Sequence, residues 1–137
     1  MQPVLLDTCA VIWMVEEAQL SQPAVKLLQA AAEGAGRTYI SPITAWEIGL
    51  LVSRGRMQIT AAPDRWFARL FEVPGVLLAD MPPDVLIASS FLPGVPPRDP
   101  ADRIIAATAR DLGATLITRD RALLAYGGQG HLNVVAC

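Results

Sequence analysis

Short apolar runs alternate with longer amphipathic stretches along this chain. Each run is bounded by Gly, Pro, Asp or other turn-forming residues, which indicates a buried β-strand rather than a helix. The expected strands cover residues 3–7, 37–41, 75–80, 114–120 and 131–136. Continuous apolar strands separated by helices are typical of a largely parallel sheet covered on both faces, so we predict an α/β fold.

Helix start and stop residues mark the segments between these strands. Ser21 and Ser41 each precede a proline and an apolar stretch, as N-cap residues do, and Gly113 has the position of a C-terminal stop. The expected helices cover residues 8–18, 22–34, 42–54, 64–72, 82–92, 100–113 and 121–126. We expect the proline-rich segment 93–98 to be a loop within one domain that spans residues 1–137, since either side alone is too small to fold well.

Five carboxylates are expected at one edge of this sheet. Asp7 ends the first strand and Asp120 follows the fourth, and functional groups gather beyond the carboxyl ends of parallel strands. Glu47 lies early in the helix that follows the second strand. Asp99 and Asp102 begin the helix that leads into the fourth strand, so its N-terminus must lie near the same edge. We therefore predict that the five side chains converge.

Each of these carboxylates also has a purely local interpretation. Asp99 and Asp120 suit N-caps, and Asp102 suits the first turn of a helix, where the dipole favours negative charge. Glu47 could be a solvated helix residue. Asp7 has the weakest local explanation, because a carboxylate after a buried apolar strand is costly unless it is paired or metal-bound. The five residues together carry more weight than any single one.

Composition narrows the chemistry that these acids can perform. The chain has 137 residues, 53% of them hydrophobic, which excludes a disordered chain. One His and two Cys are too few for a zinc finger or for acid–base chemistry by two histidines. Clustered carboxylates repel one another, and a divalent cation relieves that repulsion. Oxygen ligands favour Mg²⁺ or Mn²⁺, ions that activate water for phosphodiester cleavage.

Hydroxyl and guanidinium groups lie close to the acids in sequence. Thr8, Ser41 and Thr118 could orient metal ligands or a metal-bound water, although each also suits a cap or strand end, which is the expected role of Ser41. Arginine suits phosphate contacts, and the alternative is an ion pair with the acids or simple solvation. The candidate residues for contacts to the phosphates of a nucleic acid such as RNA are Arg98, Arg103 and Arg119.

The charge balance excludes a simple basic nucleic-acid module, because the formal net charge is −2. With the five clustered acids set aside, however, eight acidic residues remain against eleven basic ones. A metal-loaded pocket is therefore compatible with RNA binding. No apolar stretch approaches the length of a membrane span, and the N-terminus lacks a signal-peptide pattern. We expect a cytoplasmic protein with no membrane partner.

Four motifs in order resemble those of PIN-domain ribonucleases, and specifically the VapC-type toxins of toxin–antitoxin pairs. The motifs are LLDTCAVIW (5–13), SPITAWEIGLLVSRGRM (41–57), RDPADRIIAATA (98–109) and LITRD (116–120). The resemblance implies a three-layer α/β/α fold with strand order 3-2-1-4-5 and Mg²⁺- or Mn²⁺-dependent cleavage of RNA. It also implies a homodimer and a VapB-like antitoxin. The acidic positions that carry over from the family are Asp7, Glu47, Asp102 and Asp120, with Asp99 as an auxiliary acid.

Two departures from the family pattern leave the acids intact. Members often have His where this chain has Pro97 and Phe where it has Ala101, positions that bear on substrate contacts. Three other functions remain as alternatives. They are a PIN nuclease of RNA processing, a non-catalytic interaction protein and a receiver domain; the last usually needs a lysine near its final strand, and this chain has only Lys26.

Overall fold

A five-stranded parallel sheet forms the centre of the molecule. The computed structural model describes residues 3–16, 19–34 and 36–137. The strands are β1 (Val4–Leu6), β2 (Thr38–Ile40), β3 (Val76–Leu78), β4 (Thr115–Thr118) and β5 (Asn133–Ala136). Their order is β3-β2-β1-β4-β5, and every pairing is parallel. The predicted α/β class and the strand order that the resemblance implies are both confirmed.

Helices surround the sheet in the predicted order. They are α1 (Thr8–Val15), α2 (Gln22–Ala32), α3 (Pro42–Ser53), α4 (Pro63–Arg69), α5 (Pro83–Ala88), α6 (Pro100–Leu112) and α7 (Arg121–Gly128), with a 3₁₀ helix η1 (Leu70–Glu72) after α4. Helix α1 ends at Val15, earlier than the expected 8–18, and residues 17–18 lie outside the described residues. Among the described residues, no helix is long and apolar enough to cross a membrane.

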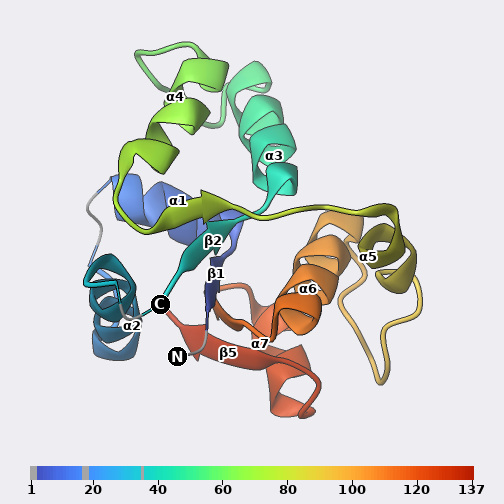
Figure 1. The fold of residues 1–137 in the computed structure, drawn as a ribbon. Helices are drawn as coiled ribbons and strands as arrows, with labels where there is room; N and C mark the ends of the chain where they lie inside the picture. The colour runs from blue at the N-terminus through green and yellow to red at the C-terminus, as the bar shows by residue number, and fades with distance from the viewer. Residues whose placement is uncertain (1–2, 17–18, 35) are drawn as a thin grey trace.

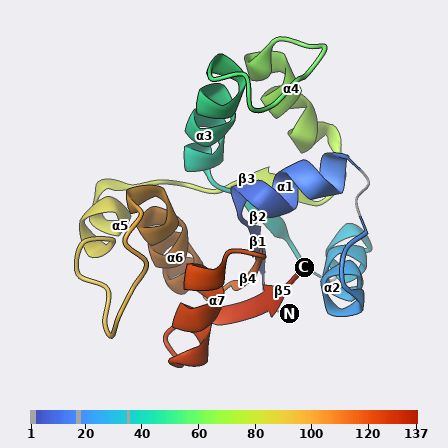
Figure 2. The same cartoon turned by 180° about the vertical axis from the view of Figure 1, so that it is seen from behind.

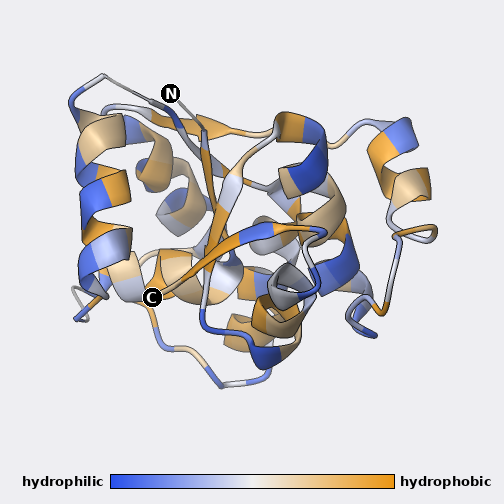
Figure 3. Cartoon of the chain, turned by 90° about the horizontal axis from the view of Figure 1, so that it is seen from below, coloured by the Kyte–Doolittle hydropathy of each residue, from blue (hydrophilic) through white to orange (hydrophobic). Residues whose placement is uncertain are grey.

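Side chains that alternate along the strands build two separate cores. Leu6 and Ile117 face α1, α2 and α4, whereas Leu5 and Leu116 face α6 and α7. This period-two pattern explains why the strands read as unbroken apolar runs, because both faces of the sheet are covered. In Figure 3, hydrophobic residues lie along the strands, and the helices carry both hydrophobic and hydrophilic residues.

The order of the strands indicates which edge of the sheet can bind a ligand. Strands β2 and β3 lie on one side of β1, and β4 and β5 lie on the other, so the strand order reverses between β1 and β4. Ligands in such folds bind beyond the carboxyl ends of the strands at this point. Helices α3 and α4 lie side by side beyond that edge (Figures 1 and 2). Helix α5 packs against α6, after a long segment that leaves β3 and runs across the molecule (Figure 1).

Candidate metal and catalytic pocket

One small cavity at the carboxyl edge of the sheet gathers all five of the predicted carboxylates. Its volume is about 270 Å³. The residues that line it are Asp7, Thr8, Cys9, Glu47, Asp99, Asp102, Ile105 and Asp120. These side chains come from α1, α3, α6 and the start of α7. The convergence expected from strand ends and helix starts is therefore present in the fold, and we call this cavity the acidic pocket.

Three of these carboxylates cap helices as well as line the pocket. Asp7, Asp99 and Asp120 precede α1, α6 and α7, and each accepts a hydrogen bond from the backbone N–H three residues further on. The donor–acceptor distances are 2.8, 3.0 and 2.9 Å. The positive ends of three helix dipoles consequently point toward the pocket, which offsets part of the repulsion among the acids. The capping interpretation of these three residues is confirmed, whereas their role in metal binding stays a prediction.

The pocket raises the pKa values of three of its acids, Asp7, Glu47 and Asp102. Burial is the first cause for Asp102, and the neighbouring carboxylates of Asp120, Asp99, Glu47 and Asp7 add to it, so that its pKa rises to about 7. Burial is also the first cause of the raised pKa values of Asp7 and Glu47. Among the described residues, every charged group that shifts these three pKa values is another carboxylate. A proton or a cation is needed to stabilise this arrangement.

Two threonine hydroxyls hold the carboxylates in place. Thr118 donates a hydrogen bond to Asp7 Oδ2 and accepts one from the backbone N–H of Asp120 at 3.0 Å. Thr8 donates to Glu47 Oε1 at 2.6 Å. Both bonds favour the charged form of the acid and lower its pKa, against the larger effect of burial. Two of the three hydroxyls predicted near the acids, those of Thr8 and Thr118, thus contact them directly.

Arg119 lies beside the pocket but is bound within the fold. Its Nε donates to the backbone oxygen of Cys137, and its Nη2 donates to the backbone oxygen of Gln19 at 2.9 Å. The guanidinium carbon lies over the ring of Trp13, 2.9 Å from the centroid. These contacts join the exit of β4 to α1, to the segment after α1 and to the end of β5. A contact between Arg119 and RNA stays a prediction.

The remaining predicted residues take three different positions. Arg98 is exposed in the loop before α6. Arg103 is half-buried on α6, with its Nη1 3.4 Å from the backbone oxygen of Ser89. Ser41 is fully buried and caps α3, where its hydroxyl accepts from the N–H of Ile43 at 3.1 Å. Ser41 does not line the acidic pocket, in agreement with its expected capping role.

Sequence reasoning missed three residues of this region. Cys9 and Ile105 line the pocket, and the fully buried Thr44 lies behind it, 3.1 Å from the hydroxyl of Thr8. Burial and four nearby carboxylates raise the pKa of Cys9 to about 11, so its thiol is neutral at physiological pH. Thr44 had a usable signal, since it precedes Glu47 by three residues and so shares its helix face.

The donor set fits a hard divalent cation. Five carboxylates line the cavity and could supply oxygen ligands, and a positive charge would relieve the repulsion that helps to raise the pKa values of Asp7, Glu47 and Asp102. Across residues 3–16, 19–34 and 36–137, no three His, Cys, Asp or Glu side chains already surround one ion position. Small side-chain movements within the cavity, toward a cation that attracts all five, would be required to complete a coordination shell.

Comparison with known proteins identifies the family. The model of the PIN domain matches residues 4–129 of this chain. The chain belongs to the PIN-domain family. This PIN domain is also similar to a protein from Mycobacterium tuberculosis named Ribonuclease VapC22, with 34% identity over 127 residues, which cover 92% of this chain and 93% of that one.

Solved structures share the fold of this PIN domain. Crystal structures of VapBC2 from Rickettsia felis bound to a promoter DNA fragment and of FitAcB from Neisseria gonorrhoeae have TM-scores of 0.67 and 0.57. The identities are 15% and 24%, and the alignments cover 98% of both chains in the first case and 96% and 95% in the second. At these identities, the likeness concerns the fold alone.

Proposed function

We propose that this PIN-domain protein is a divalent-metal-dependent endoribonuclease and the toxin of a toxin–antitoxin pair in the cytoplasm. The observation that carries the proposal is the acidic pocket, in which five carboxylates from four helices line one cavity at the sheet edge. The 34% identity to a protein named a ribonuclease supports RNA as the substrate.

The ligands of that ion would be Asp7, Asp102 and Asp120, with Asp99 as a further ligand. Mg²⁺ and Mn²⁺ suit oxygen donors in this number and charge. When bound, such an ion provides an activated water and stabilises negative charge on phosphate oxygens. One or two ions are compatible with a cavity of about 270 Å³.

The protein side chains would then position water and substrate. Glu47, held by the hydroxyl of Thr8, orients the water that attacks phosphorus in line with the leaving 3′ oxygen. Thr118 keeps Asp7 in its position through their hydrogen bond. Cleavage in this sense yields a 5′-phosphate and a 3′-hydroxyl end. Arg98, exposed in the loop before α6, can reach a neighbouring phosphate of the RNA.

Protein partners form the second part of the proposal. Solved structures of similar fold include VapBC2, FitAcB and FitAB, which supports a VapB-like antitoxin for this chain. A homodimer is what the resemblance to VapC-type toxins implies, and we propose it as well. Exposed apolar side chains support binding to other proteins. Trp46 on α3 is 58% exposed and Phe91, after α5, is 80% exposed. Burial of such residues against a partner would stabilise an assembly.

The decisive experiment is cleavage of total RNA by the purified protein with and without Mn²⁺, followed by mapping of the ends. We expect metal-dependent fragments with 5′-phosphate ends from the wild type. Asp7→Asn keeps the helix cap and removes the charge, so it should abolish the fragments. Full activity in that variant would contradict the site, and no wild-type cleavage would contradict the nuclease assignment.

Two further measurements separate this proposal from its alternatives. An interaction protein whose acids only cap helices should gain no thermal stability from Mn²⁺, whereas a metal site should gain it by linkage. A nuclease of RNA processing should not arrest growth when it is expressed without a partner. We expect growth arrest by the wild type and normal growth with Asp7→Asn at equal protein level.

A further inference from the structure

A buried pair of hydroxyls lies behind the carboxylate of Glu47. Thr8 Oγ1 is 2.6 Å from Glu47 Oε1 and 3.1 Å from Thr44 Oγ1. Thr44 is completely buried, and Thr8 is 6% exposed. The three side chains therefore form a continuous chain of hydrogen bonds that runs from the interior to the acidic pocket.

The number of protons on each hydroxyl decides which residue donates in each of these two hydrogen bonds. A hydroxyl has one proton to donate, and Thr8 donates its proton to the carboxylate of Glu47. The oxygen of Thr8 can then only accept from Thr44, so Thr44 is the donor in the bond between them. Hydrogen bonds in such a chain polarise one another, which strengthens the last bond to the carboxylate.

The hydrogen bonds among Thr44, Thr8 and Glu47 also join two helices. Thr44 and Glu47 are three residues apart on α3, whereas Thr8 is the first residue of α1. Thr8 follows Asp7 directly, and Asp7 and Glu47 line the same cavity. Thr44 on α3 fixes the hydroxyl of Thr8 on α1, and this contact sets the position of Glu47 relative to Asp7.

A second buried helical threonine, Thr108, directs its hydroxyl differently from Thr44. Thr108 on α6 is 2% exposed, and its hydroxyl donates to the backbone oxygen of Ile104 at 2.7 Å. Such bonding within one helix is the ordinary fate of a helical threonine hydroxyl. Thr44 instead directs its hydroxyl across to α1, toward the pocket.

We propose that Thr44 is a positioning residue, which fixes the direction of the Thr8 hydroxyl and thereby holds Glu47 in its orientation in the pocket. The inference rests on the proposed nuclease function only for the kinetic part of its test. Thr44 touches neither substrate nor ion. It acts through Thr8, and its removal should lower the rate of cleavage without weakening RNA binding.

The kinetic test compares Thr44→Val, Thr44→Ser and the matched control Thr108→Val on one defined RNA with saturating Mn²⁺. We expect Thr44→Val to lower kcat about fivefold, the worth of one ordinary hydrogen bond, with KM within about twofold. Thr44→Ser should restore kcat, and Thr108→Val should leave it unchanged. An unchanged kcat in Thr44→Val, or no rescue by serine, would overturn the proposal.

A second measurement works without metal and without activity. Urea unfolding in EDTA gives a double-mutant cycle for Thr44→Val and Glu47→Gln, with Thr108→Val and Glu47→Gln as the control cycle. We expect coupling in the first cycle and additivity in the second. Additivity in both would overturn the role of Thr44 even if the wild type cleaves RNA, and coupling would support it even if the wild type does not. If valine prevents folding, Thr44→Cys provides a poor donor of similar size for both tests.

Discussion

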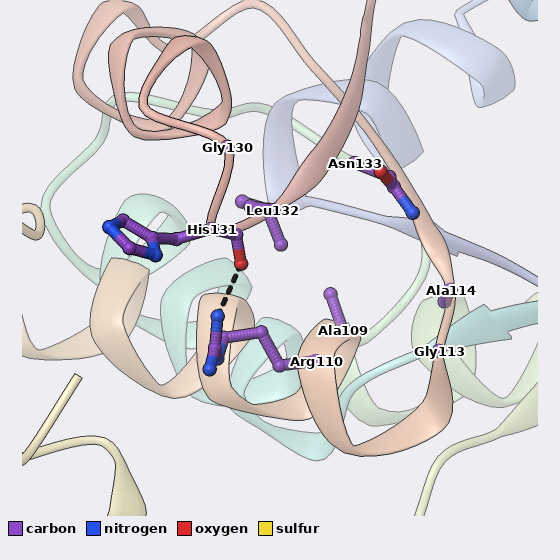
Figure 4. A pocket seen from close by; sticks show the side chains of 8 residues that line it. All are labelled: Ala109, Arg110, Gly113, Ala114, Gly130, His131, Leu132 and Asn133. Atoms are coloured by element: carbon purple, nitrogen blue, oxygen red, sulfur yellow. Dashed lines mark hydrogen bonds between the residues drawn. The ribbon is translucent and has the colours of Figure 1, made fainter. Parts of the chain in front are cut away.

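Helix α6 runs between two pockets of similar size and opposite character. The acidic pocket at its N-terminus has a volume of about 270 Å³ and receives Asp99 and Asp102 from this helix. The pocket at its C-terminus has a volume of about 300 Å³, and we call it the Arg110 pocket. Its lining residues are Ala109, Arg110, Gly113, Ala114, Gly130, His131, Leu132 and Asn133 (Figure 4).

The two pockets differ in how their charges are compensated. Arg110 lies in the last turn of α6, where a cation suits the dipole, and its guanidinium donates to the backbone oxygen of His131 (Figure 4). The ring of His131 lies 5.5 Å from that of Tyr126, so this histidine belongs to the packing of α7. The acidic pocket, in contrast, concentrates like charges that the fold alone does not neutralise. Uncompensated charge, rather than cavity size, distinguishes the candidate site.

The largest expected effect is on the rate of RNA cleavage, which should depend on the acidic pocket and not on the Arg110 pocket. Asp102→Asn should lower RNA cleavage at least about 100-fold, because it removes a proposed ligand at the centre of the reaction. Arg110→Ala should leave kcat and KM within about twofold. Both variants are assayed on the same RNA with saturating Mn²⁺. Equal losses in the two variants would mean that the acidic pocket has no special role.

Stability in the absence of metal should depend on pH through the acidic pocket. The pKa of Asp102 is raised from 3.8 to about 7, so the folded protein holds more protons than the unfolded chain between these values. The free energy of unfolding should therefore fall as the pH rises from about 4 to about 7. Urea unfolding in EDTA measures it, and Asp102→Asn should flatten the slope. A wild-type slope of the opposite sign, or one unchanged in the variant, would contradict the assigned electrostatics.

A smaller effect should separate the capping and the pocket roles of Asp99. Asp99→Ala should lower the free energy of unfolding by about 1 kcal/mol, because α6 loses its side-chain cap. Asp99→Ser keeps a capping oxygen and should recover most of that stability without restoring the pocket charge. Thermal unfolding and Mn²⁺ titration of both variants check this. If serine restored Mn²⁺ affinity as well, the carboxylate of Asp99 would have no part in metal binding.

The smallest expected effect is in the Arg110 pocket. Arg110→Ala should cost about 0.5 kcal/mol of unfolding free energy, since the guanidinium is exposed and its bond to His131 competes with water. This loss should not change with pH between 5 and 8 or with Mn²⁺. A dependence on either would show that the two ends of α6 are coupled.

The sequence predicts the position of a residue well where a local signal, such as an N-cap, agrees with the alternation of strands and helices. Asp7, Asp99 and Asp120 precede helices that begin at the carboxyl edge of the sheet, so their convergence follows from the order of elements. The alternation of strands and helices likewise predicts a sheet covered on both faces. Strand ends were less certain, because the pairing of short strands depends on their neighbours; β3 covers only Val76–Leu78 of the expected 75–80.

Contacts between distant segments could not be predicted in this way. The guanidinium of Arg119, a candidate RNA contact, also binds backbone oxygens of Gln19 and Cys137, which come near it only in the folded chain. The bond between Thr8 and Thr44 joins residues 36 positions apart. The direction of a side chain at such positions is a tertiary property, and no local rule contains it.

The dual use of the helix caps has a consequence for genetic variation in this protein. A substitution of Asp7, Asp99 or Asp120 by a residue that cannot cap removes a pocket charge and also weakens a helix start, so the cell loses both activity and folded protein. Glu47 and Asp102 are not N-cap residues, so their substitution removes a pocket charge without removing a side-chain cap. A lineage that silences this protein while it keeps a folded copy at full abundance should therefore accumulate its changes at Glu47 and Asp102.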